Sequence, residues 1–153
     1  MRKLAYLACA GLILGLSVHG SQQTKPEEKQ AATRTLKVKL AYSGAGAVDE
    51  KHKIFVFLFD SADFVQGGVM PIGAKSAAAK DETVTFADLT VSPVFVAVSY
   101  DPKGEYDGVS GPPPSGSSMG MYSKTPGTPE PVKIEPGKTV QIELAFDDTA
   151  KMP

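Results

Sequence analysis

Three acidic residues follow one another closely in the segment DPKGEYDG, which begins at residue 101. Asp101, Glu105 and Asp107 place carboxylate oxygens on one turn-rich loop, and calcium binds such closely spaced oxygens. Lys103, however, stands where a calcium loop usually carries Asp or Asn. The alternative is a solvated turn in which Asp101 accepts hydrogen bonds from backbone N–H groups. Calcium is thus the one cofactor that the sequence suggests, and both interpretations stay open.

The segment GSSMG at 116–120 matches the G-x-S-x-G pattern of hydrolases, with Ser118 in the nucleophile position. That chemistry needs a strained strand-to-helix turn, with Asp and His later in the chain. Here the flanks are rich in proline, and His52 precedes the serine. A single histidine without cysteine is also a poor transition-metal site, so we expect a surface residue. We predict that the protein is not an enzyme and has no catalytic residues.

Tyr100, Tyr106, Met121 and Tyr122 gather around the same part of the chain. A tyrosine ring is apolar and its hydroxyl is polar, which suits a surface that binds sugar or protein. The alternative is that these side chains fold back and cap the core, because loops need apolar anchors to stay ordered. The first interpretation makes these four residues a candidate binding surface, whereas the second makes them part of the core packing.

The N-terminus has the pattern of a secretory signal peptide. Arg2 and Lys3 precede an uncharged stretch from Leu4 to Val18, and small or permissive residues lead up to Ser21. The stretch is too short for a comfortable membrane span, and Cys9 lies too early in it for a lipidation signal. We predict a signal peptide over 1–20 and a polar, flexible tether over 21–33. The protein is then exported, periplasmic or secreted from a bacterial envelope, with no membrane span after cleavage.

The charges argue against a nucleic-acid partner. The whole chain has 16 Lys and Arg against 17 Asp and Glu. Loss of Arg2 and Lys3 with the signal peptide leaves 14 basic residues, so the mature chain is slightly acidic. Phosphate backbones bind basic surfaces, and none is indicated here. The mature chain also has no cysteine, and its core must stabilise the fold without disulfides.

Seven short segments have the alternating or continuous apolar pattern of β-strands. They are residues 35–42, 54–59, 72–76, 83–86, 94–100, 132–134 and 139–146. The run IFVFLF at 54–59 predicts a strand buried on both faces. Pro136 and Gly137 occupy the central positions of a type II turn before the last strand. We predict one all-β domain over 34–149, a seven-stranded antiparallel Greek-key β-sandwich.

One segment within this domain predicts a long loop. Residues 101–131 contain seven of the twelve prolines and many glycines. Loops of this length inside a compact domain are uncommon and often functional. We therefore expect the loop to form the contact surface.

Two stretches carry a family resemblance. VTFADLTVSPVFVAVSYD and PVKIEPGKTVQIELAF resemble the transthyretin-like, carboxypeptidase-regulatory-like sandwiches of small bacterial exported proteins. Phe86, Leu89, Phe95, Ala97 and Asp101 occupy comparable places, although Ser92-Pro93-Val94 replaces the usual Pro-Gly before the aromatic residue. The likeness covers roughly residues 35–148 and implies a fold and an accessory role, not a reaction.

Together these observations predict an exported, non-catalytic module with a structural or protein-interaction role in the cell envelope. The alternative is a calcium-stabilised or carbohydrate-binding module that uses the 101–131 loop. The partner is accordingly an unidentified protein or glycan.

Overall fold

The computed structural model describes residues 33–153. The predicted signal peptide and all but the last residue of the predicted tether lie outside this range. Within this range the chain forms seven strands and one short 3-10 helix, which is η1. Their bounds are β1 Arg34–Tyr42, β2 Ile54–Phe59, η1 Ala62–Gln66, β3 Gly73–Ala77, β4 Thr83–Leu89, β5 Phe95–Tyr100, β6 Ser118–Met121 and β7 Thr139–Phe146.

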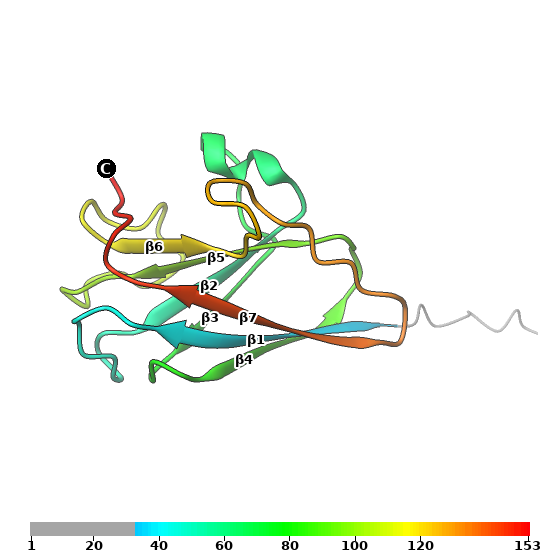
Figure 1. Cartoon of the computed structure of the whole chain (residues 1–153), viewed down its shortest axis with the longest axis horizontal. Helices are drawn as coiled ribbons and strands as arrows, with labels where there is room; N and C mark the ends of the chain where they lie inside the picture. Colours follow the sequence, from blue (N-terminus) through cyan, green and yellow to red (C-terminus); the bar gives the residue numbers. More distant parts are fainter. Residues whose placement is uncertain (1–32) are drawn as a thin grey trace, which may run out of the picture.

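The strands form two sheets, which pack face to face (Figure 1). One sheet has the order β4-β1-β7 and the other the order β3-β2-β5-β6. Alternate residues of β1 and β7 point inward, where burial of their apolar surface drives the packing. The all-β class expected from the sequence is therefore confirmed, and the Greek-key connectivity stays a prediction.

Strand β2 is buried on both faces, as its continuous apolar sequence predicted. Ile54, Val56 and Leu58 face the core between the sheets. Phe55, Phe57 and Phe59 form a second cluster on the outer face. The side chains packed against this outer cluster come from η1, from β5 and from two loops; they are Phe64, Phe95, Ala97, Val69 and Tyr106.

Two details of the predicted sandwich were wrong. The strands are not all antiparallel, because β1 and β7 pair in parallel from Thr35–Thr139 to Tyr42–Phe146. A parallel pair needs a long connection, and nearly the whole domain lies between these two strands. In addition, 132–134 is not a full strand, because only Val132 forms a bridge, with Val94.

The predicted loop over 101–131 is also interrupted. Strand β6, from Ser118 to Met121, lies within it and pairs with β5. The four residues of β6 can form a strand because their partner, β5, is already paired with β2 on its other side. The tight turn at 135–138 is confirmed, since Lys138 N–H donates to Glu135 O and Gly137 has a φ of 74°. Within residues 33–153, no helix is long and apolar enough to cross a membrane.

Candidate functional site

Asp101 is a loop-ordering residue in this structure. Its carboxylate accepts backbone N–H bonds from Lys103 at 2.9 Å, Glu105 at 2.8 Å and Tyr106 at 3.0 Å. Burial disfavours the charged form, but these three donors outweigh it and hold the pKa of Asp101 below its ordinary value. The turn that the sequence offered as an alternative to calcium is thus present.

Asp107 orders a second, separate turn. It accepts the N–H groups of Val109 and Ser110, and the Ser110 hydroxyl at 2.5 Å. The hydroxyl and these N–H groups lower the pKa of Asp107 to about 2. Glu105 is exposed and joins neither turn through its side chain. Across residues 33–153, no three His, Cys, Asp or Glu side chains come together as metal ligands would. The geometry therefore offers the calcium hypothesis no shared site.

The four candidate binding residues do not form one exposed face. Tyr100 is buried in the core, and its hydroxyl donates to Ala47 O at 2.7 Å. Tyr106 stacks edge-on against Phe55 on the outer face of the second sheet. Tyr122 is partly buried against the core, and Met121 is partly buried on β6. Three of the four thus anchor apolar clusters, as the capping interpretation described.

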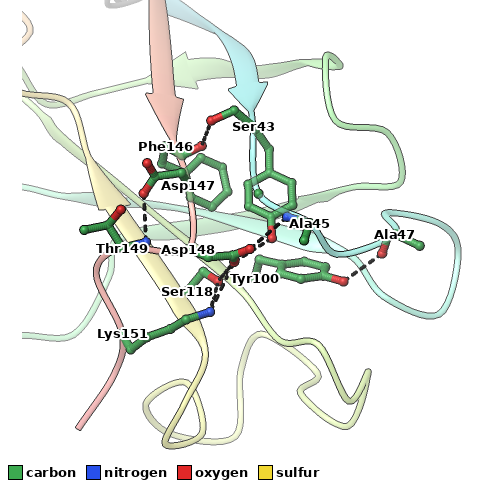
Figure 2. A network of polar contacts seen from close by, with 12 residues as sticks. Ser43, Ala45, Ala47, Tyr100, Ser118, Phe146, Asp147, Asp148, Thr149 and Lys151 are labelled. Carbon is green, nitrogen blue, oxygen red and sulfur yellow. Dashed lines mark hydrogen bonds and ion pairs between the residues drawn. The ribbon is translucent and has the colours of Figure 1, made fainter.

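Asp148 is the centre of a polar network at one end of the sandwich (Figure 2). Its Oδ1 accepts the hydroxyls of Ser118 at 2.5 Å and Tyr42 at 2.8 Å, and lies 3.1 Å from Lys151 Nζ. Its Oδ2 accepts Ala45 N–H at 2.8 Å. Lys151 Nζ also donates to the Ser118 hydroxyl at 2.7 Å. The network therefore joins both sheets, the loop after β1 and the C-terminal tail.

The electrostatics of this network favour a fixed carboxylate. The hydroxyls of Ser118 and Tyr42 and the N–H of Ala45 hold the pKa of Asp148 far below its usual range. Burial, together with the bond to Asp148, raises the pKa of Tyr42 to about 12. Both shifts favour the native pairing of carboxylate and protonated phenol near neutral pH.

The C-terminal tail pairs with β6 beside this network. Gly116 N–H donates to Met152 O, Met152 N–H to Ser117 O, and Met119 N–H to Ala150 O. The tail therefore lies along the outer edge of β6 through these hydrogen bonds and one isolated bridge between Ser118 and Lys151. Ser118 lies beneath it with no exposed surface, and its hydroxyl is held by Asp148 and Lys151. Asp148 and Lys151 thus both engage the buried Ser118 hydroxyl, and we call this polar network the clamp because it links the two sheets and the tail.

His52 is partly buried in the turn before β2, and its Nδ1 lies 2.9 Å from Asp49 Oδ1. No hydrogen bond joins His52 to Ser118 within residues 33–153. His52 contacts Asp49, whereas Ser118 contacts Asp148 and Lys151.

A groove of about 440 Å³ lies between strands β3 and β4. These are the edge strands of the two sheets, and the groove opens where the start of β3 faces the end of β4. Its floor includes Leu58 and Phe86, which belong to the core. Ile72 and Val91 line it while remaining 45% and 37% exposed. Accessible apolar side chains beside an unpaired strand edge are typical of interaction surfaces.

The groove has two charged lining residues, Lys75 and Asp88. Lys75 Nζ lies 5.7 Å from the centre of the Phe86 ring. Asp88 has a φ of 56°, at a bulge where β4 has one residue more than β1 between Phe86 and Leu89. Such bulges redirect side chains at sheet edges and often lie beside functional sites.

Sequence reasoning missed this groove. Its residues come from β2, β3, β4, the residue before β3 and the segment after β4, and no spacing along the chain brings them together. The nearest sequence signal is the apolar segment VMPI at 69–72, in which Met70 and Ile72 are exposed and Ile72 lines the groove.

Comparisons with known proteins do not add a family to these observations. No family model, no curated protein and no solved structure matches the chain.

Proposed function

We propose that the protein is an exported, non-catalytic module that binds another protein in the cell envelope. The β3–β4 groove is its contact surface. The observation that carries the proposal is this groove, which exposes Ile72 and Val91 between two strand edges above the core residue Phe86. Water is displaced favourably from such apolar side chains when a partner covers them.

A protein partner fits the groove better than a glycan does. Sugar sites commonly present aromatic rings to the ligand, whereas Tyr100 and Tyr106 are used within the fold. A strand edge, by contrast, offers backbone N–H and C=O groups to another polypeptide. We therefore propose the groove as the contact surface in place of the 101–131 loop, which the sequence suggested.

The non-catalytic role is supported by the buried state of Ser118. Export rests on the pattern of residues 1–20, and the transthyretin-like affiliation and Greek-key connectivity rest on strand and turn patterns. All three are parts of the same proposal.

Site-specific photo-crosslinking in the native cell tests the contact surface. A photoreactive amino acid replaces Val91 in the groove or Val109 in the 101–131 loop; Val109 is 74% exposed and lies away from the groove lining. We expect a discrete protein adduct from position 91 and none from position 109. Adducts from position 109 alone, or from neither position, would overturn the proposal.

A further inference from the structure

Met119 and Met121 point away from the core on the outer face of β6. Ser118 points inward, where its hydroxyl bonds to Asp148. A Cβ at Gly120 would also point inward, because it would lie against core side chains. Side chains alternate along a strand, so the residues that follow Ser118 and Gly120 face outward. Both methionines are partly exposed on that face.

Met152 shares this face from the C-terminal tail, which runs beside β6 (Figure 1). Lys151 forms an antiparallel bridge with Ser118, and its ammonium group donates to the Ser118 hydroxyl on the inner side. The next residue, Met152, therefore points outward. Its N–H donates to Ser117 O, which places it beside the start of β6. Three of the five methionines of the chain thus lie on one face at one sheet edge.

The spacing allows their sulfurs to turn toward one another. Met119 and Met121 are two residues apart on one strand, about 7 Å between Cα atoms. Met119 and Met152 are diagonal neighbours across the paired segments, about 7–8 Å between Cα atoms. Methionine is unbranched and has three rotatable bonds, so such neighbours can direct their sulfurs to a common point. Met119 lies between the other two and is the central member of the group.

These methionines do not fill gaps in the apolar packing. Within residues 33–153, neither hydrophobic cluster includes them, as buried members or as side chains packed against it. Their neighbours across the sheet are small, since Met121 pairs with Ala97 and Met119 with Ser99. Ser99 and Ser117 also hold buried hydroxyls without a hydrogen-bond partner among the described residues. Buried hydroxyls are normally satisfied, and water beside a bound ion would satisfy these two.

We infer that Met119, Met121 and Met152 form a binding site for the soft monovalent ion Cu(I) at the edge of β6. Thioether sulfur is a soft ligand that favours Cu(I), whereas hard cations such as Ca2+ favour oxygen. The site is separate from the groove, because β6 and β3 are opposite edges of the four-stranded sheet. The inference therefore goes beyond the proposed function and does not depend on it.

Anaerobic titration of the purified protein with Cu(I), in competition with the chromophoric Cu(I) chelator bicinchoninate, tests this inference. Every chain carries Cys9→Ser, because the thiolate of the single cysteine would bind soft ions itself. We expect one Cu(I) to be retained per chain. Replacement of any one of the three methionines by Leu, in M119L, M121L or M152L, should weaken binding by about tenfold or more. Met70→Leu is the control; Met70 is 73% exposed in the segment before β3, and its replacement should leave binding unchanged.

Titration with Ag+, a soft ion of the same charge, locates the site independently. Nuclear magnetic resonance of carbon-13-labelled methionine methyl groups should show shifts at Met119, Met121 and Met152 and none at Met70. Leucine is close to methionine in volume, so the variants should fold, and circular dichroism checks this.

Three outcomes would overturn the inference. The first is a wild type that leaves all Cu(I) with bicinchoninate. The second is a set of folded leucine variants that bind Cu(I) as tightly as the wild type does. The third is a set of Ag+ shifts that is confined to Met70 or absent.

Discussion

Replacement of Asp148 by Asn is the most informative test of how the two sheets are held together. The substitution keeps the size of the side chain and removes its charge. In the native network the carboxylate accepts from Ser118, Tyr42 and Ala45, and Lys151 lies 3.1 Å away. An amide has one acceptor oxygen, so its NH2 group must face at least one of these donors.

The expected loss is about 2–3 kcal/mol of unfolding free energy. A hydrogen bond to a charged group contributes about 1.5–3 kcal/mol, and bonds that share one carboxylate do not add independently. The Asp148 side chain is 36% exposed, so solvent screens its pairing with Lys151. For a domain of this size, the midpoint of thermal unfolding should fall by about 10 °C.

Asp147→Asn is the matched control. Asp147 is the neighbouring residue, is exposed, and accepts the backbone N–H of Thr149. Its replacement should lower the unfolding free energy much less than that of Asp148, because Asp147 is exposed and solvent screens its charge. Urea unfolding of both variants, followed by circular dichroism, measures the difference. Equal stabilities of the two variants would refute the clamp.

Three further predictions concern pH, backbone strain and calcium. Asp148, Asp101 and Asp107 have pKa values lowered by folding, so the stability they contribute is present above about pH 4 and is lost as the pH falls toward 2. Tyr42 has a raised pKa, so the stability it contributes is complete below about pH 10 and is lost as the pH rises through about 12. Urea unfolding measured across pH tests the acid and the alkaline prediction, and a stability that stays constant in both pH ranges would contradict them. Gly108→Ala should destabilise the fold by about 1–3 kcal/mol, because a Cβ there would lie 2.4 Å from Phe55 Cδ1, whereas Gly111→Ala shares the positive φ without a neighbour and should cost less. Thermal melts in calcium and in chelator should coincide, since Asp101 and Asp107 already bind backbone N–H groups; a shift of several degrees would restore the calcium hypothesis.

Local patterns were sufficient to locate most of the strands. The alternation in β1 and β7 and the apolar run in β2 are local properties, and each became the strand that its period predicted. The turn at Pro136 and Gly137 is local too. Strand β6 has no such signal, because SMGM is short and flanked by proline and glycine. Its formation depends on pairing with β5, a contact that only the folded sheet supplies.

The candidate site also depends on contacts that form only in the folded chain. The sequence placed three acids on one loop, but two of them fold their own turns with nearby N–H groups. Asp148, Ser118 and Tyr42 are far apart in the chain. They meet only because β1 and β7 end beside the start of β6. The groove likewise lies between β3 and β4, which are edge strands of different sheets. The order of residues along the chain shows neither which side chains meet at the network nor which strands border the groove.

The size of the native species in cell-envelope extracts tests most directly whether the groove is the contact surface. Val91→Arg places a charge in the groove, and Val109→Arg places the same charge in the 101–131 loop, where the sequence located the contact. We predict that the wild type and Val109→Arg elute together as a complex, whereas Val91→Arg elutes at the size of a folded monomer. Elution of Val91→Arg with the wild type, or loss of the complex only in Val109→Arg, would contradict the account.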